Sequence, residues 1–273
     1  MDAVNKMFDL SGRVAIVTGG AGLLGREFSK TLAQAGASVV VADIDERKSR
    51  GVAQELQGMD LGALSVPVDV RDPTSVAAML ARTLREWGRV DILVNSAALD
   101  PKFEPGSRGE FANAFEDFPL EAWNRALEVN LTGLLLCSQA VSRAMLENGR
   151  GVMINLCSTY GLVGPDQRIY QGEGQPSQFK PVYYSVTKAG VLGLTRYLAA
   201  YYAGKNLRVN ALTPGGIWQN QDPMFVKEYS ARTILGRMAR GDEMNAALLF
   251  LASDASSYMT GANLVVDGGW TAW

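Results

Sequence analysis

The chain of 273 residues contains no histidine and only two cysteines, Cys137 and Cys157. Without an imidazole, the chain cannot build a Ser-His-Asp hydrolase, a Cys-His protease or a histidine-ligated zinc site. Two cysteines without metal-binding spacing are too few for a disulfide framework, so they favour a reducing compartment and predict no metal site. Proton transfer in this protein must therefore use Tyr, Lys, Asp, Glu or a bound cofactor.

The sequence also lacks an excess of charge and a long apolar run. It has 26 basic and 28 acidic residues, a net charge of −2 and no extended block of one sign. This balance does not favour binding to nucleic acid or to an anionic membrane. No apolar run reaches the ~18 residues of a membrane span, and residues 1–12 have no secretory signal pattern. We therefore expect a cytoplasmic protein whose partner is a small molecule, with no nucleic acid or membrane partner.

Short apolar runs rich in Val, Ile and Leu alternate with helical patterns along the whole chain. This alternation, without a linker or an internal repeat, predicts a single-domain α/β Rossmann fold over residues 1–273. Its core would be a doubly wound parallel sheet of about seven strands with helices on both faces. Three irregular loops, near residues 99–118, 164–181 and 217–240, would form the substrate pocket. The expected strands are residues 13–18, 38–42, 64–68, 90–94, 152–156, 208–212 and 263–266; the main expected helices include 46–57, 119–148, 182–203 and 242–252.

A glycine-rich turn joins the first expected strand to the following helix. Gly20, Gly22 and Gly25 fit the spacing G-x-G-x-x-G, which brings backbone N–H groups and a helix N-terminus against a pyrophosphate. The pattern is weak by itself, since any tight strand-to-helix turn uses glycine. Asp43 adds to it, because this acid ends the second strand 18 residues after Gly25, close to the ~20 residues typical of a ribose-binding carboxylate.

Asp43 also bears on which dinucleotide binds. A carboxylate at this place repels the 2′-phosphate of NADP, and Ile44 beside it supplies no cation. Arg47 and Lys48 follow closely enough to supply one. We expect NAD as the cofactor, with NADP less favoured.

Candidate ligand residues also follow the next two strands, at the edge where parallel sheets bind ligands. Asp69 and Val70 follow the third expected strand, although Asp69, like Asp72, could simply cap the next helix. Asn95 and Ala97 follow the fourth, where small residues allow a flat ligand to approach the backbone.

Tyr184 and Lys188 lie early in the expected helix 182–203. Four residues apart on a helix, the two side chains project from the same face. An ammonium beside a phenol favours the phenolate, so that a group that normally titrates near pH ~10 can exchange protons closer to neutrality. The alternative is an amphipathic helix that carries a Tyr and a Lys by chance.

Taken in order, these motifs resemble the short-chain dehydrogenase/reductase family, in its compact single-domain branch of NAD(P)-dependent oxidoreductases, over essentially the whole chain. The resemblance implies a catalytic set of Ser158, Tyr184, Lys188 and Asn130, with Thr159 as the alternative to Ser158. By itself, Asn130 would be interpreted as a solvent-facing residue inside a helix. The cofactor-binding residues that the resemblance implies are Gly19, Gly22, Leu24, Gly25, Asp43, Ile44, Asp69, Val70, Asn95, Ala97, Tyr184, Lys188, Pro214, Gly215 and Ile217.

The chain departs from the family pattern at several places. Leu23 replaces the middle glycine, which gives the turn the spacing of the sugar-nucleotide epimerase and dehydratase branch, but 273 residues leave no room for that branch's substrate domain. Gln219 stands where a threonine often contacts the carboxamide. Ser158 and Tyr184 are 26 residues apart, so residues 165–181 look like an insertion beside the site. The insertion and the tail 270–273 give a weaker resemblance to dehydrogenases of bacterial surface-sugar biosynthesis.

The family implies reversible hydride transfer between a nicotinamide cofactor and a secondary alcohol or ketone. Polar residues in the three loops favour a hydroxylated substrate, a sugar, sugar acid, polyol or nucleotide sugar, although loops are polar in any protein. Rival hypotheses are an NADPH-dependent ketoreductase, a catalytically silent dinucleotide sensor or scaffold, and a sugar-nucleotide epimerase or dehydratase. The family also implies a homo-oligomer, a tetramer or dimer, formed through the helices of Asn130 and Tyr184. The polar loop residues are Lys102, Arg108, Arg168, Gln171, Glu173, Gln175, Gln219 and Asn220.

Overall fold

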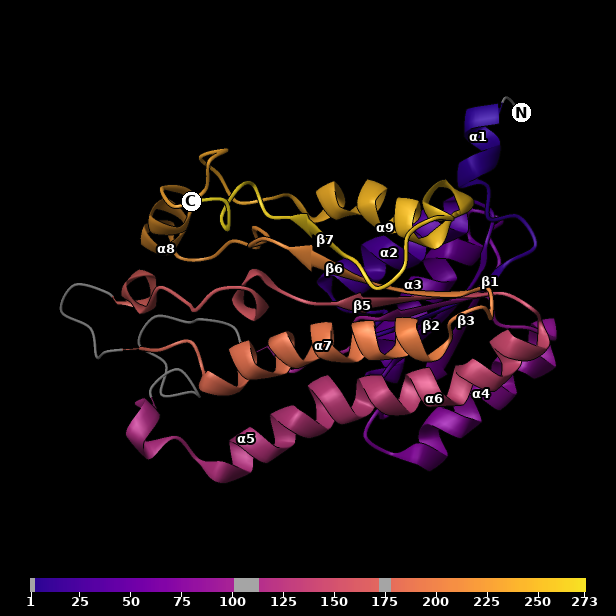
Figure 1. The fold of residues 1–273 in the computed structure, drawn as a ribbon, viewed down its shortest axis with the longest axis horizontal. Helices are drawn as coiled ribbons and strands as arrows, with labels where there is room; N and C mark the ends of the chain where they lie inside the picture. The colour runs from indigo at the N-terminus through magenta and orange to yellow at the C-terminus, as the bar shows by residue number, and fades with distance from the viewer. Residues whose placement is uncertain (1–2, 101–112, 172–177) are drawn as a thin grey trace.

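The computed structural model describes residues 3–100, 113–171 and 178–273. Its centre is a sheet of seven parallel strands in the order β3-β2-β1-β4-β5-β6-β7, with helices on both faces (Figure 1). The predicted Rossmann-type α/β fold with about seven strands is confirmed. The strands are β1 (Val14–Thr18), β2 (Ser38–Asp43), β3 (Ala63–Pro67), β4 (Ile92–Asn95), β5 (Gly151–Leu156), β6 (Leu207–Pro214) and β7 (Asn263–Val266).

The central strands are apolar because helices cover them on both sides. Every residue of β1 and of β5 is buried, which is typical of parallel strands between two helical layers. β1 pairs with β2, where Thr18 lies opposite Ala42, and with β4, where Thr18 lies opposite Asn95. The strand order therefore reverses between β1 and β4, and their carboxyl ends border the crevice in which such sheets bind ligands.

Two layers of helices complete the core. α2 (Leu23–Gln34), α3 (Glu46–Gln57) and α9 (Asn245–Ala252) bury their apolar side chains against one face of the sheet. α4 (Pro73–Trp87), α6 (Gly133–Glu147) and α7 (Val182–Tyr201) cover the other face and lie below the sheet in Figure 1.

The predicted helix 119–148 consists of three parts. Pro119 is the N-cap of α5 (Leu120–Leu127) rather than a member of its first turn. A π-helical turn (Glu128–Thr132) follows, and α6 completes the segment. π-helical turns are rare and frequently mark functional sites, and this one contains Asn130.

The segment 217–240, expected to be irregular with helical pieces, contains α8 (Pro223–Ser230). The Asp222 carboxylate caps this helix by accepting hydrogen bonds from the backbone amides of Met224 and Phe225, at 2.9 and 3.2 Å. The expected helix 242–252 divides into a 3₁₀ turn (Gly241–Met244) and α9. A short first helix, α1 (Ala3–Phe8), had no sequence signal, since none of its residues is buried. Other 3₁₀ turns are Phe115–Asp117, Thr159–Gly161, Gln167–Tyr170 and Asp254–Ser256.

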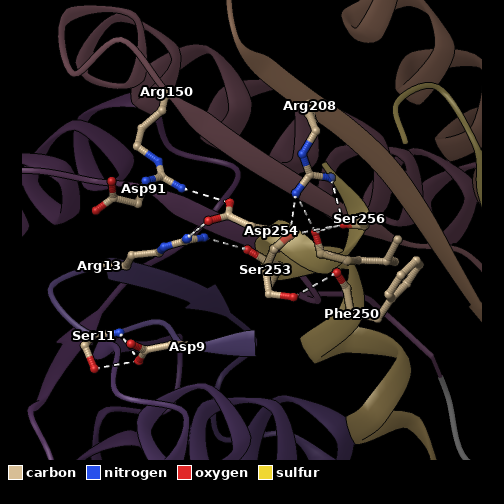
Figure 2. A network of polar contacts seen from close by, with 12 residues as sticks. Asp9, Ser11, Arg13, Asp91, Arg150, Arg208, Phe250, Ser253, Asp254 and Ser256 are labelled. Atoms are coloured by element: carbon tan, nitrogen blue, oxygen red, sulfur yellow. Dashed lines mark hydrogen bonds and ion pairs between the residues drawn. The ribbon is translucent and has the colours of Figure 1, made fainter. Parts of the chain in front are cut away.

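A polar network joins the start of the chain to its last part, at the amino ends of the strands (Figure 2). Arg13 donates to one oxygen of Asp254 at 2.6 Å, and Arg150 donates to the other at 3.2 Å. Arg208 donates to the Ser256 hydroxyl, to the carbonyl oxygen of Leu251 in α9 and to those of Ser253 and Met259 between α9 and β7. This edge lies opposite the ligand-binding edge, so the network stabilises the fold.

Among residues 3–100, 113–171 and 178–273, no helix has the length and apolarity needed to cross a membrane. Within the same ranges, no three His, Cys, Asp or Glu side chains are grouped so that they could hold a metal ion.

Candidate active site

The glycine turn after β1 is folded so tightly that side chains would not fit. A Cβ atom on Gly25 would lie 2.0 Å from the carbonyl oxygen of Gly19. Gly19 itself has φ +62° and packs against Ala97, where an added Cβ would lie 2.8 Å from the Ala97 Cα. Gly22 is the N-cap of α2 without a side chain to cap it, and Leu24 packs its partly buried side chain into the core. The N-terminus of α2 is thus left open for a phosphate group.

Asp43 joins this turn to the end of β2. One carboxylate oxygen accepts a hydrogen bond from the amide of Ala21 at 3.0 Å, and the other accepts from the amide of Asp45 at 3.0 Å. Ile44 beside it is 70% exposed. The structure therefore places a half-buried carboxylate directly at the glycine turn, where the adenosine ribose of a dinucleotide would bind.

The predicted contacts after β3 and β4 occupy different environments. Asp69 pairs with Arg71 through both carboxylate oxygens, which lowers the pKa of Asp69. Val70 is buried against Gly133. The side-chain nitrogen of Asn95 donates to Ser138 at 3.2 Å and to Asn155 at 2.9 Å, inside the protein. The Asn95 amide therefore braces β4 against β5 and α6.

The residues predicted to be catalytic meet at the carboxyl end of β5. The hydroxyl of Ser158 acts to lower the pKa of the Tyr184 phenol and accepts a hydrogen bond from the amide of Tyr160 at 3.3 Å. Lys188, one turn along α7, donates from Nζ to the carbonyl of Leu156 at 2.9 Å. Ser158, Tyr184 and Lys188 are all buried, and the structure brings all three together.

Asn130 is buried, not solvent-facing. In the π-helical turn its Oδ1 accepts from the amide of Leu99 at 2.6 Å. Its Nδ2 donates to the carbonyl of Leu99 at 3.2 Å and to the hydroxyl of Thr187 at 3.1 Å. Asn130 therefore holds the loop after β4 against the helix of Tyr184.

The electrostatics of Tyr184 differ from the sequence-based expectation. Burial, and secondarily the carboxylate of Asp100, raise the pKa of Tyr184 well above its usual value, while the hydrogen bond from Ser158 acts in the opposite direction. Burial lowers the pKa of Lys188, whose Nζ lies 5.8 Å from the centroid of the Tyr184 ring. In the protein alone, burial therefore outweighs the lowering expected from Lys188.

Lys180 and Asp100 were not predicted to belong to the site. Lys180 Nζ lies 4.0 Å from the centroid of the Tyr184 ring and pairs with Asp100 at 2.6 Å. A signal exists in hindsight, because Lys180 lies four residues before Tyr184. It precedes α7, however, so helical periodicity could not place it.

An aromatic cluster lies beside Tyr184 and was also missed. The phenol of Tyr170 donates to that of Tyr160 at 3.0 Å, and the Tyr160 ring meets the Tyr184 ring edge-on at 6.4 Å. Trp270, from the C-terminal tail, stacks on Tyr229 of α8 at 4.2 Å. Burial raises the pKa of Tyr229 to about 12. The apolar wall thus combines segments far apart in sequence, which no local motif indicates.

The turn after β6 adjoins this cluster. The Gly216 amide donates to the Tyr229 hydroxyl at 2.6 Å, and Ile217 forms a parallel bridge with Ala239. A Cβ on Gly215 would lie 2.8 Å from the Cα of Asp267, so glycine follows Pro214 by steric necessity. Of the polar loop residues, Lys102, Arg108, Glu173 and Gln175 lie outside the described residues; Arg168, Gln171, Gln219 and Asn220 lie within them.

Comparisons with known proteins agree with this geometry. The family model described as "Enoyl-(Acyl carrier protein) reductase" matches residues 20–271. A cis-4-hydroxycyclohexanecarboxylate dehydrogenase from Sinomonas cyclohexanicum is 37% identical over 267 residues, which is 95% of this chain and 97% of that protein. A D-threitol dehydrogenase from Mycolicibacterium smegmatis is 35% identical over 273 residues, covering 97% of this chain and 95% of that one.

Solved structures give the same result. A short-chain type dehydrogenase/reductase from Mycobacterium marinum has a TM-score of 0.85 and 34% identity, with 99% of each chain covered. A gluconate 5-dehydrogenase from Burkholderia cenocepacia, in complex with NADP and tartrate, has a TM-score of 0.86 and 30% identity, again with 99% of each chain covered. These names do not refer to surface sugars, so that weaker resemblance stays a prediction. The chain belongs to the short-chain dehydrogenase/reductase family and is an NAD(P)-dependent oxidoreductase that acts on CH–OH groups.

Proposed function

We propose that the protein is an NAD-dependent dehydrogenase that interconverts a secondary alcohol and a ketone on a hydroxylated small molecule, such as a sugar, sugar acid, polyol or nucleotide sugar. The observation that carries this proposal is that Ser158, Tyr184 and Lys188 are buried together at the carboxyl end of β5, at the same edge of the sheet as the glycine turn that Asp43 holds. Relatives named for D-threitol and for gluconate support a hydroxylated substrate.

The residues present fit a dinucleotide. The glycine cradle around Gly19 and Gly25, which a Cβ would fill, and the open N-terminus of α2 would receive the pyrophosphate. Asp43 would bind the adenosine ribose. The other cofactor contacts that we propose are Gly22, Leu24, Ile44, Asp69, Val70, Asn95, Ala97, Tyr184, Lys188, Pro214, Gly215 and Ile217.

The catalytic roles that we propose are those that the family resemblance implies for these side chains. A nicotinamide held at this edge would supply the hydride acceptor for oxidation of the carbinol carbon and the hydride donor for reduction. Tyr184, as phenolate, takes the proton of the substrate hydroxyl, and in reduction it gives the proton back. Ser158 hydrogen-bonds the reacting oxygen and stabilises its negative charge. Lys188 and Asn130 form the proton path behind Tyr184, and Lys188 also binds the nicotinamide ribose.

The proposed preference for NAD rests on Asp43 alone. One relative of known structure was solved in complex with NADP. We also propose that residues 1–273 form one nucleotide-binding domain, with the loops near 99–118, 164–181 and 217–240 as pocket walls. Trp270 and Tyr229 support the assignment of the last loop.

Replacing Tyr184 tests the proposed function. We expect Tyr184→Phe to lower kcat on a confirmed substrate by a factor of roughly 10²–10⁴, because a positioned acid-base group typically contributes that much. NAD binding, measured by fluorescence titration, should persist. Tyr183→Phe removes a hydroxyl from the neighbouring buried side chain and should leave kcat within a few-fold. Full turnover by Tyr184→Phe would refute the mechanism.

A further inference from the structure

Lys180 occupies a position in the active site that the mechanism above does not use. Its ammonium lies 4.0 Å from the centroid of the Tyr184 ring, and its side chain is only 9% exposed. The carboxylate of Asp100, in the loop after β4, holds it at 2.6 Å. A buried lysine on the face of a proposed catalytic phenol bears directly on the charge of that phenol.

The backbone of Lys180 is fixed as well. The Gln167 side chain accepts a hydrogen bond from the Lys180 amide at 2.8 Å and donates to the Lys180 carbonyl at 3.3 Å. Pro181, the N-cap of α7, follows immediately. Lys180 is therefore held by the 3₁₀ turn Gln167–Tyr170 on one side and by the start of α7 on the other, within the segment that separates Ser158 from Tyr184.

Lys180 is closer to the ring than Lys188 is. Lys188 Nζ lies 5.8 Å from the centroid and is bound to the carbonyl of Leu156. A cation on the face of an aromatic ring is attracted to its π-electrons, and the attraction is stronger when the ring becomes anionic in a site with little water.

We propose that Lys180 is a positioning residue of the active site: its ammonium, held by Asp100, stabilises the phenolate form of Tyr184 during turnover. This inference rests on the proposed role of Tyr184 as the acid-base group. Asp100 has two opposing effects, because it fixes the ammonium but its own negative charge disfavours the phenolate. The pair thus sets the pH at which Tyr184 becomes a base.

The other groups that face Tyr184 are the same in the wild type and in variants at positions 180 and 100. Cys157 and Tyr160 approach it from the segment after β5, together with the hydroxyl of Ser158. Lys188 approaches from α7 itself. Substitutions at positions 180 and 100 therefore alter the charge around the phenol while those four side chains stay in place.

The test is the pH dependence of kcat/KM for alcohol oxidation, where the rate rises as the phenolate forms. Removing the ammonium in Lys180→Met should move this rise to higher pH by about 1 unit. Asp100→Asn should move it to lower pH, and the double variant should return close to the wild-type profile. Lys180→Arg keeps the charge and should retain that profile. Lys205→Met is the matched control, since it removes an exposed lysine in the turn that follows α7.

A second readout does not depend on turnover. The ultraviolet difference spectrum of phenolate formation, wild type minus Tyr184→Phe, should titrate at higher pH when Lys180→Met is present in both proteins. Should Lys180→Met fail to fold, Lys180→Gln takes its place, because it also removes the ammonium but keeps a polar side chain, and the same shift to higher pH is expected.

The outcomes separate this inference from the proposed function. If Tyr184→Phe is inactive but Lys180→Met and Asp100→Asn superimpose on the wild-type profile, with only KM changed, Lys180 is a substrate contact and the inference is wrong. If Tyr184→Phe keeps its activity, the proposed function fails first. Opposite shifts in the two single variants, cancelled in the double variant, would support the inference.

Discussion

The carboxylate of Asp43 accepts from two backbone amides, those of Ala21 and Asp45, at 3.0 Å each. It therefore shapes the glycine turn and also carries the charge that would repel a 2′-phosphate. Asparagine at this position removes the charge and one of the two acceptor oxygens; the weaker turn should affect both cofactors, whereas the loss of charge should favour only NADP.

We expect Asp43→Asn to raise the ratio of kcat/KM with NADP to that with NAD by roughly tenfold, equivalent to about 1.4 kcal/mol. The measurement is steady-state kinetics with both cofactors. Asp45→Asn is a matched control, because that carboxylate caps α3 through the amide of Lys48 at 3.0 Å and should not alter the ratio. A wild-type protein that prefers NADP would contradict the role given to Asp43.

Among the elements, the 3₁₀ turn Gln167–Tyr170 is tied to the end of α8 by one carboxylate. Asp166 accepts from Arg232 at 2.7 Å and from Arg168 at 2.7 Å, and these arginines hold the pKa of Asp166 far below its usual range. A lowered carboxyl pKa means that the link is present at neutral pH and is lost only as the pH falls through that low value.

We expect Asp166→Asn to reduce the free energy of unfolding by about 1 kcal/mol and to speed limited proteolysis near α8. Arg232→Ala should act similarly, since its side chain is 25% exposed. Arg168, at 82% exposure, serves as the control: its replacement by alanine should cost less than about 0.5 kcal/mol. Equal effects at the two arginines would show that the link does not hold α8.

The elements that local chemistry governs were predictable. The expected strand 38–42 is extended by one residue, to Asp43 itself, and the helix 46–57 was predicted with its observed bounds. The π-helical turn around Asn130 was not, because the sequence around it satisfies the pattern of an ordinary helix and the distortion depends on contacts with Leu99 and Thr187.

In the candidate site, too, local spacing could be predicted from the sequence but contacts between distant residues could not. Tyr184 and Lys188 could be paired from spacing alone, since four residues make about one helical turn. Their burial could not, and burial is what raises the pKa of Tyr184. Asp100 and Trp270 reach the site through tertiary packing, which no short sequence pattern indicates, and Lys180, although four residues before Tyr184, precedes α7, so helical spacing could not place it.

On the scale of the whole molecule, the network of Figure 2 connects the first strand to the segment after α9. Arg13 is buried, whereas Arg150 is partly exposed, and both donate to Asp254.

Removing the carboxylate leaves a buried guanidinium without this partner, so Asp254→Asn should lower the free energy of unfolding by about 1–2 kcal/mol in urea titrations. Arg150→Ala removes only the exposed half of the network and should cost less than about 1 kcal/mol. If Arg150→Ala lowered the free energy of unfolding more than Asp254→Asn does, the greater weight given to the buried Arg13–Asp254 pair would be wrong.

The assembly predicted from the family, a dimer or tetramer, depends on the outer faces of α6 and α7. The stretch 131–136 is partly used within the protomer, since Leu134 is buried and Leu131 packs over Gly190. Tyr197 and Tyr201, however, are 62% and 66% exposed and stack on each other at 6.0 Å. Large apolar surface of this kind is typical of an interface between subunits.

We therefore expect sedimentation velocity to give a dimer or tetramer for the wild type and a smaller species for the double variant Tyr197→Glu and Tyr201→Glu, because a buried interface cannot accommodate four or more new carboxylates without partners. Met59→Glu, an exposed apolar residue just after α3, is the control and should leave the wild-type assembly intact. Thermal unfolding of the double variant should depend less on protein concentration than that of the wild type, since association stabilises only the folded chain. A wild type that sediments as a monomer at every concentration would refute the assembly, and an unchanged oligomer in the double variant would move the interface away from α7.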